Sequence, residues 1–342
     1  MATNLSVRLT DRLATVRAID DWALQQEAGD AGDRGDLRAA VARDLVQLAA
    51  LRTAVNALAA AGIAALVMKG AALSFTCYPN HFRPRNDDDL LVAPADFDAA
   101  SHALARAGYR MTVQIDDVAV VGQRLFCRDV SGVTHHLDLH ARPLNPLAFA
   151  DLPSFAALSA RSIALPELGE HARAVGPVDA LVLACAHRVA HHTATEDPLW
   201  LFDIHLLAGG LRADQWREFI TTAQAARVAR LSASELQRAA STHHTAIPPD
   251  VIDQLALATG EASARHLQTL GPLHTQWLNL RDAAGWRPRI DMLRSHLFPP
   301  VGYMRQRYAD APDTPLPALY ARRLFDGSTR WLREWLDRYR AA

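Results

Sequence analysis

Three consecutive acidic residues stand directly before an apolar run of strand length in the segment RPRNDDDLLV, at residues 83–92. Side chains alternate between the two faces of a strand, so Asp87 and Asp89 share one face while Asp88 points to the other. A second strand-like segment, HHLDLHAR, carries Asp138 between two leucines and on the same face as His140. If the two strands are neighbours, Asp87, Asp89 and Asp138 meet at one place.

A cluster of carboxylates needs compensating positive charge. Two carboxylates roughly 5 Å apart repel by about 3 kcal/mol at an effective dielectric constant of about 20. All-oxygen ligands suit hard cations such as Mg²⁺ or Mn²⁺, and a pair of such ions can clamp the attacking and leaving oxygens of a phosphoryl displacement. The acids therefore predict a divalent metal site that serves phosphoryl chemistry.

A lysine and a glycine follow the apolar run IAALVM, where a buried strand would end. We expect a turn at Lys69 and Gly70 that is exposed and functional. Taken alone, the pair would equally suit a solvated turn. Arg83 and Arg85 could neutralise the neighbouring acids across the loop.

The elements that would position these residues follow from periodicity. Apolar residues at three- and four-residue spacing predict helices over 37–61 and 95–107, each followed by a glycine, and a short helix over 71–78. We predict strands over 63–68 and 88–92, with further strand-like runs at 110–115, 119–129 and 134–142. This order predicts an α/β domain over residues 37–146.

The remaining parts of the chain have a different texture. Long segments rich in alanine, leucine and arginine predict a helical domain over residues 151–342. We expect a helical segment over residues 1–36. The aromatic and leucine stripe of RWLREWLDRYR predicts a packing face on the last helix.

Composition narrows the class of protein. A formal net charge of -1 over 342 residues gives no general basic footprint for nucleic acid, although a local basic groove is still possible. Three scattered cysteines do not suggest a disulfide framework. No stretch has the length and apolar character of a membrane span, and the N-terminal residues do not resemble a secretory signal. We expect a soluble, cytoplasmic protein with no membrane partner.

The ordered set of motifs resembles a known family, the uncharacterised nucleotidyltransferases of the DNA polymerase beta-like superfamily. The resemblance rests on VMKGAALSFTCYPNHFRPRNDDDLLV and HHLDLHARP, with further similarity in ACAHRVAHH, LWLFDIHLL and LFPPVGYMRQRY. It implies an α+β fold in which a small mixed-sheet domain, flanked by helices, is followed by a mostly helical domain on the acceptor side of a cleft. Asp88 stands where the family commonly has an apolar residue, so we expect its strand face not to be deeply buried.

The resemblance also implies an activity. Asp87, Asp89 and Asp138 would bind two Mg²⁺ (or Mn²⁺) ions. Lys69 and Gly70 would correspond to the triphosphate loop of the superfamily and contact the phosphates of an NTP, with ATP the first choice, because glycine allows close approach of the backbone and lysine adds a point charge. Arg83 and Arg85 could add bidentate phosphate contacts. The enzyme would transfer a nucleoside monophosphate to a hydroxyl or phosphate of a small molecule, peptide or protein and release pyrophosphate. The sequence identifies neither the acceptor nor the oligomeric state.

The histidines support a second interpretation. His187 and His191 are four residues apart on a predicted helix and share a face, with Asp203 on the next helix, so they could form a zinc site for a hydrolase. They lack a third conventional ligand nearby, and we favour a role for His140, His187, His191 and Asp203 on the acceptor side or in packing. The sequence is also compatible with toxin-like nucleotidyl transfer to RNA and with a non-catalytic nucleotide-binding module.

Overall fold

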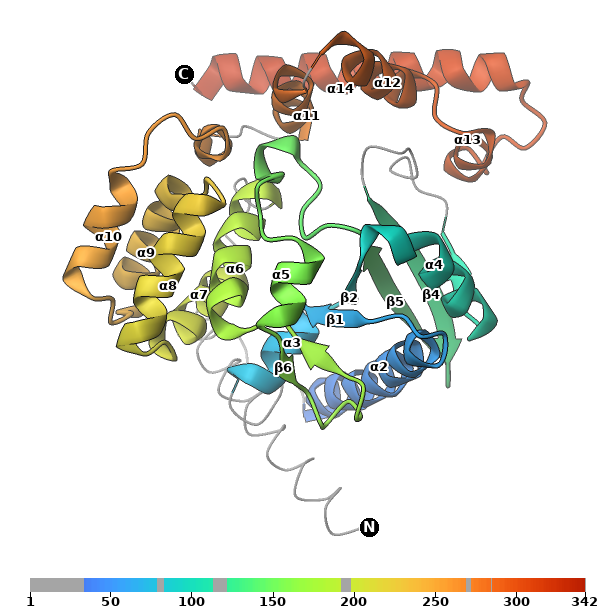
Figure 1. The fold of residues 1–342 in the computed structure, drawn as a ribbon. Coiled ribbons are helices and arrows are strands. Elements are labelled where there is room, and N and C mark those ends of the chain that lie inside the picture. Colours follow the sequence, from blue (N-terminus) through green and yellow to red (C-terminus); the bar gives the residue numbers. More distant parts are fainter. Residues whose placement is uncertain are drawn as a thin grey trace.

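The computed structural model describes residues 34–78, 83–112, 122–191, 198–268, 272–283 and 285–341. Helices make up 60% of it and strands 12%, which confirms a mixed sheet flanked by helices and followed by a mostly helical region (Figure 1). The segment predicted to be helical over residues 1–36 falls outside the described residues up to residue 33, and helix α2 begins at Arg34.

One mixed sheet organises the first half of the chain. Its strands lie in the order β3-β4-β5-β2-β1-β7-β6. Their bounds are β1 Ala65–Met68, β2 Asp87–Val92, β3 Arg110–Met111, β4 Gln123–Val130, β5 Val133–His140, β6 Ile163–Ala164 and β7 Arg173–Ala174. The strands predicted around residues 66, 90, 126 and 137 are therefore present. The region beyond residue 151 adds β6 and β7 to the same sheet, in a part of the chain with few strand signals.

Two helices bury one face of the sheet. Helix α2 (Arg34–Ala60) ends just before Gly62, whose φ of +73° turns the chain into the first strand. Helix α4 (Phe97–Arg106) follows a short 3₁₀ turn and ends before Gly108, which also has a positive φ. Leucines and alanines of both helices pack on Leu90, Leu137 and Leu139. Burial of these apolar side chains fixes the register of β2 and β5 and so decides which residues face the other side.

The other half is a helical bundle built on α6 (Pro177–His191) and α7 (Pro198–Gly209). The bundle also contains α8 Ala213–Ala225, α9 Ala229–His243 and α10 Pro249–Ala256. Helix α5 (Phe155–Ala160) instead packs through Leu158 on Leu66 and Leu91 of the sheet. Helix α3 (Lys69–Thr76) belongs to the first half of the chain, yet Leu73, with Tyr78 just beyond the helix, lies in the hydrophobic core of this bundle. The sheet and the bundle are thus joined by a shared core.

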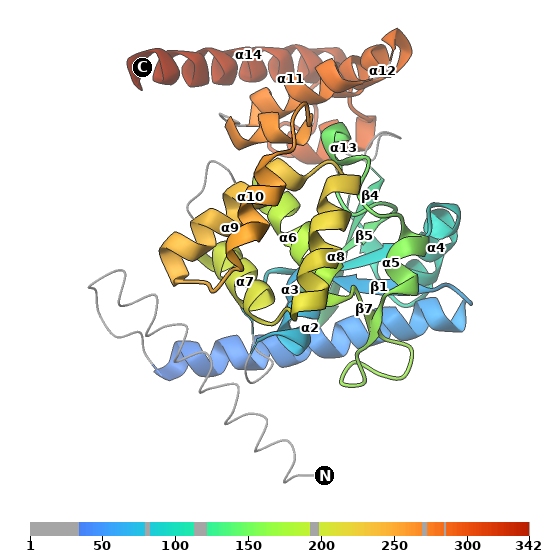
Figure 2. The same ribbon diagram turned by 60° about the vertical axis from the view of Figure 1, so that its left-hand side comes forward.

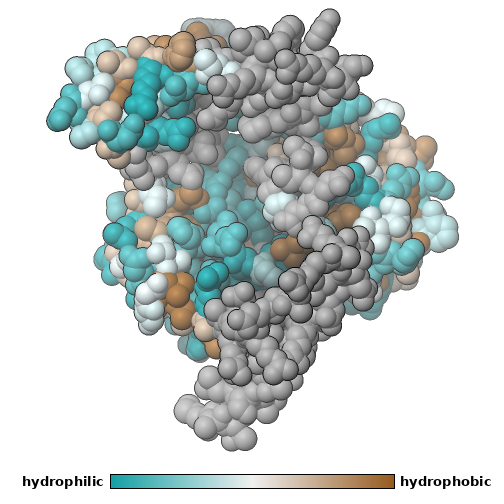
Figure 3. Space-filling view, turned by 180° about the vertical axis from the view of Figure 1, so that it is seen from behind, coloured by the Kyte–Doolittle hydropathy of each residue, from teal (hydrophilic) through white to brown (hydrophobic). Residues whose placement is uncertain are grey.

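Four further helices form a separate layer at the C-terminal end: α11 Pro272–Asp282, α12 Trp286–Leu297, α13 Val301–Arg307 and α14 Leu316–Ala341. This layer lies on one side of the molecule, and α2 lies on the opposite side (Figure 2). Seen from behind, the described surface is recessed and hydrophilic in its middle, below this layer (Figure 3). Among the described residues, no helix has the length and hydropathy needed to cross a membrane.

Candidate functional site

The acidic strands β2 and β5 are neighbours and run parallel. Asp89 pairs in register with Asp138, and Asp87 pairs with His136. Register partners point to the same face, so Asp87, Asp89, Asp138 and His140 all lie on the face opposite α2 and α4. Because the leucines of these strands pack on the α2 side, the three aspartates and His140 face the opposite side of the sheet.

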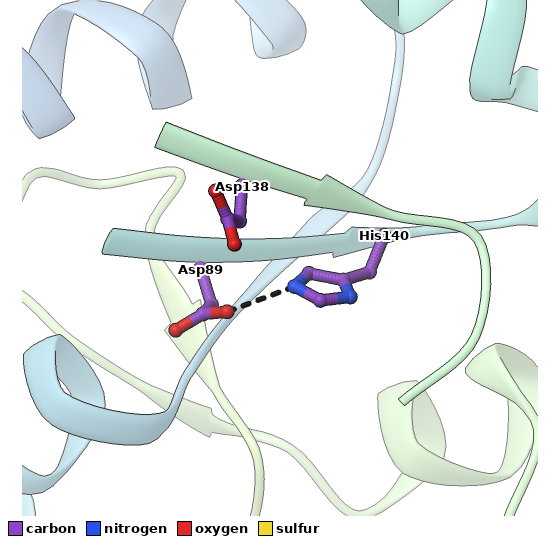
Figure 4. Close-up of side chains that lie close together, drawn as sticks. All are labelled: Asp89, Asp138 and His140. Carbon is purple, nitrogen blue, oxygen red and sulfur yellow. Dashed lines mark hydrogen bonds and ion pairs between the residues drawn. The ribbon is translucent and has the colours of Figure 1, made fainter. Parts of the chain in front are cut away.

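Asp89, Asp138 and His140 form a cluster that could hold a metal ion (Figure 4). Each offers one ligand atom, and these atoms lie within 4.8 Å of one another. Asp87 lies on the same strand face but outside this three-residue group, and its side chain is exposed. The structure thus brings Asp89 and Asp138 together, with Asp87 beside them.

One oxygen of Asp89 has two partners. Its Oδ1 atom accepts a hydrogen bond from Lys69 Nζ at 2.6 Å and lies 2.8 Å from His140 Nε2. Burial alone would raise the pKa of Asp89, but Lys69 and His140 outweigh it and hold that pKa well below its usual range. Burial lowers the pKa of His140, so at neutral pH its ring is uncharged and Nε2–H donates to the carboxylate.

Asp138 is in a different electrostatic state. Burial, together with the negative charges of Asp89 and Asp87, raises the pKa of Asp138 to about 7. Its Oδ2 atom accepts a hydrogen bond from Gln123 Nε2 at 2.6 Å. The same two causes, burial and then Asp89, raise the pKa of Asp87. The carboxylates of Asp87, Asp89 and Asp138 therefore repel one another, as expected from the sequence.

Lys69 and Gly70 do not form the exposed turn that we predicted. Lys69 has a φ of +49° and begins helix α3 directly after β1, and Gly70 is buried. A Cβ atom at Gly70 would lie 2.6 Å from Arg83 Nη1 and 3.3 Å from Arg85 Cβ. A larger side chain at residue 70 would press on the two arginine side chains that pack against the helix start.

Both arginines are bonded to buried carboxylates. Arg83 donates from Nε and Nη2 to the two oxygens of Asp203 at 2.7 and 2.6 Å, a bidentate pair that joins the loop before β2 to helix α7. Tyr78 also donates to Asp203, at 2.7 Å. Arg85 donates to Asp88 at 2.6 Å and is also paired with Asp44 of α2.

The prediction that the Asp88 face is not deeply buried is wrong. Asp88 is only 1% exposed, because Arg85 and His135 hydrogen-bond its two carboxylate oxygens. Burial would raise the pKa of Asp88, but these partners hold it below the ordinary value. A buried charge is tolerated when it is paired and hydrogen-bonded in this way.

A cavity of about 300 Å³ lies between the sheet and the helical bundle. Its first wall includes Lys69, Gly70, Arg83, Arg85, Asp87 and Asp89. Its second wall includes Ala180, Leu183, Ala184, His187, Trp200 and Asp203. The rings of His187 and Trp200 are in contact, with centroids 6.3 Å apart. His191 ends α6, and its side chain lies outside the described residues. The cavity joins the acids to the helices expected on the acceptor side.

The sequence did not predict a role for Gln123, which hydrogen-bonds Asp138, or for Trp200, which lines the cavity. Gln123 reaches Asp138 because β4 pairs antiparallel with β5 and places both residues on one face. Only the register of that pairing could have revealed it. Trp200 stands in LWLFDIHLL, a segment already singled out, but its apolar neighbours indicate a helix core and give it no distinct signal.

The chain matches none of the curated proteins with which it was compared. A family model described as "Uncharacterised nucleotidyltransferase" matches residues 34–239, which is more than half of the chain. The match includes both walls of the cavity and all strands seen in the part of the chain that the structure describes. The chain therefore belongs to this uncharacterised nucleotidyltransferase family.

Proposed function

We propose that the protein transfers a nucleoside monophosphate from an NTP, with ATP the first choice, to a hydroxyl or phosphate of a small molecule, peptide or protein, releasing pyrophosphate. The supporting observation is the meeting of Asp89, Asp138 and His140 on adjacent parallel strands, beside the cavity lined by Lys69 and Asp87. Membership of the nucleotidyltransferase family agrees with this reaction class.

The residues present fit a divalent cation. Two carboxylates and an imidazole lie within ligand reach of one another. Burial and then the charges of Asp89 and Asp87 raise the pKa of Asp138, and a cation would remove the repulsion between these carboxylates. Among the described residues, the buried Nδ1 atom of His140 has no hydrogen-bond partner. We propose that Asp89 and Asp138 hold Mg²⁺ or Mn²⁺ and that Asp87 completes the site of a second ion. When bound, such ions lower the pKa of the attacking hydroxyl and neutralise the charge on the phosphates.

The neighbouring side chains would bind and orient the substrates. Lys69 is kept charged because Asp89 and its neighbours raise its pKa more than burial lowers it. Its side chain is 25% exposed, so in the proposal it contacts a phosphate from the cavity wall. The backbone at Gly70 would approach the phosphates, while Arg83 and Arg85 would add positive charge behind that wall.

The second wall would receive the acceptor. Ala180, Leu183 and Ala184 make it apolar, and His187, Trp200 and Asp203 add polar and aromatic groups. A cavity of about 300 Å³ suits a small molecule or one side chain of a peptide or protein. The two cavity arginines are already paired with carboxylates, which makes RNA the less favoured acceptor. In this proposal His140 orients Asp89, and His187, His191 and Asp203 form or support the acceptor side.

Isothermal titration of each NTP with Mg²⁺ tests this function. The wild type is compared with the double variant Asp87→Ala, Asp89→Ala, and with a control, Asp98→Ala, Asp129→Ala, that removes two exposed acids elsewhere. We expect metal-dependent nucleotide binding by the wild type and the control and none by the first variant. Equal binding by all three proteins, or binding that does not depend on metal, would overturn the proposal.

A further inference from the structure

A chain of buried polar side chains lies on the reverse face of the sheet, behind the acidic cluster. Asp88 stands between Asp87 and Asp89 in β2 and points away from them. Its Oδ1 atom accepts from Arg85 Nε at 2.6 Å, and its Oδ2 atom lies 2.7 Å from His135 Nε2. Asp88 thus anchors the strand at the residue between two proposed metal ligands.

Arg85 connects this anchor to helix α2. Its side chain is 2% exposed, and it is paired with Asp44 of α2 as well as with Asp88. A second path reaches the same helix: Tyr109 Oη lies 3.0 Å from His135 Nδ1 and donates to the carbonyl of Ala50 at 2.9 Å. The position of β2 relative to α2 is therefore fixed at two places.

Arg85 also contacts the start of α3. A Cβ atom at Gly70 would lie 3.3 Å from Arg85 Cβ and 3.4 Å from Arg85 Cδ, so the arginine side chain packs directly on this glycine. Gly70 follows Lys69, whose positive φ and hydrogen bond to Asp89 place its ammonium group at the cavity. One guanidinium side chain thus touches both the segment that carries Asp89 and the segment that carries Lys69.

This arrangement is costly to build, because burying charges loses their hydration and an apolar replacement of the same shape often stabilises a fold equally well. A benefit other than stability is therefore needed to account for it. We propose that Arg85, which also borders the cavity, is a positioning residue: its contacts with Asp88, Asp44 and Gly70 fix the spacing of Asp87, Asp89 and Lys69 for the metal and nucleotide. The inference rests on the proposed function and assigns Arg85 a role other than phosphate contact.

The test compares Arg85→Met and the milder Asp88→Asn with Arg188→Met. Arg188 and Glu235 form a buried ion pair in the helical bundle, with side chains 5% and 2% exposed, so Arg188→Met is a matched loss of one buried partner. Mn²⁺ affinity is measured by electron paramagnetic resonance at a temperature where circular dichroism shows every variant folded. Hydrogen exchange of the amides of residues 69–71 and 86–91 is measured without metal.

Arg85→Met and Asp88→Asn are expected to weaken Mn²⁺ binding about tenfold, the lower end of the range for groups that orient metal ligands, because neither residue bonds to a proposed ligand itself. Both should also speed exchange in the two segments, whereas Arg188→Met should do neither, even with a lowered melting temperature. Wild-type affinity and wild-type exchange in the Arg85 and Asp88 variants would overturn the inference. If the wild type itself binds no Mn²⁺, the proposed function fails, and the exchange comparison still decides whether Arg85 positions these segments.

Discussion

Asp89 accepts hydrogen bonds from Lys69 and His140 at the same oxygen atom, Oδ1. The lysine supplies positive charge to the carboxylates on this face of the sheet, Asp87, Asp89 and Asp138, whereas Arg85 does so for Asp88 on the other face. A cation bound at Asp89 and Asp138 would lie close to this ammonium group, and the two positive charges would repel. The charge of Lys69 therefore affects both the proposed metal site and the proposed nucleotide site.

Replacing Lys69 separates its effect on metal binding from its effect on nucleotide binding. Lys69→Met removes a positive charge beside Asp89, so we expect tighter Mn²⁺ binding without nucleotide and weaker NTP binding with metal. Each change should be a few-fold to tenfold, or about 1 kcal/mol at the partly exposed site. Titrations of Mn²⁺ alone and of NTP with Mg²⁺ measure both constants. Weaker Mn²⁺ binding by the variant would contradict the account.

Asp138 gives the site a dependence on pH. Its pKa is raised to about 7 by burial, Asp89 and Asp87, so at pH 6 it is mostly protonated and at pH 8 mostly ionised. Metal affinity should therefore rise between pH 6 and pH 8, and much less so in Asp138→Asn.

A raised carboxyl pKa favours the protonated folded state, so the stability contributed by Asp138 is present below about pH 4 and is lost as the pH rises through 7.

Thermal unfolding without metal measures whether ionisation of Asp138 destabilises the folded protein. Asp138→Asn should be more stable than the wild type at pH 8, and this advantage should shrink as the pH falls below the folded pKa. A metal affinity that is flat from pH 6 to pH 8 in the wild type would show that Asp138 is not a ligand.

At the scale of elements, the start of α3 explains why residue 70 is glycine. Gly70→Ala would place a methyl group 2.6 Å from Arg83 Nη1 and 3.3 Å from Arg85 Cβ, so the arginines must shift. We expect a loss of about 1–3 kcal/mol in the free energy of unfolding, the usual cost of overpacking. Gly209→Ala in α7 is the control, because nothing lies within 4 Å of its Cβ position. Equal unfolding free energies for the two variants in urea would refute this packing argument.

The sequence predicted the elements best where periodicity is long. Helix α2, helix α4 and strands β2 and β5 lie close to their predicted ranges, because their apolar residues repeat over several turns or alternations. Strands β6 and β7 were missed because each has two residues and depends on pairing with the sheet. The burial of Asp88 was missed because its partner Arg85 is itself held by Asp44, 41 residues earlier, and such a contact leaves no local pattern.

At the scale of the whole molecule, the pair of Arg83 and Asp203 joins the sheet region to the helical bundle across 120 residues of sequence. Both side chains are buried, at 7% and 5% exposure, and Tyr78 donates to the same carboxylate. The two walls of the cavity are thus linked by a rigid bidentate contact. The cavity shape should depend on this contact more than on either wall alone.

Loss of Arg83 alone should lower the free energy of unfolding, and replacing Asp203 as well should restore most of it. Arg83→Met leaves Asp203 buried without its main partner, and we expect a loss of about 3–5 kcal/mol in unfolding free energy. The double variant Arg83→Met, Asp203→Leu should recover most of it, because neither charge remains buried and unpaired. Chemical denaturation of both single variants and the double variant measures the coupling. If the double variant loses as much unfolding free energy as the two single variants together, Arg83 and Asp203 do not interact directly.

In the proposed function, Asp89 and Asp138 hold a divalent ion for nucleotide transfer. A crystal structure with Mn²⁺ and a non-hydrolysable NTP tests this, because anomalous scattering locates the metal. We expect a manganese peak within bonding distance of the carboxylates of Asp89 and Asp138, with the triphosphate next to Lys69 and Gly70. A bound nucleotide with its metal elsewhere, or a manganese peak at the His187 helix face alone, would contradict it.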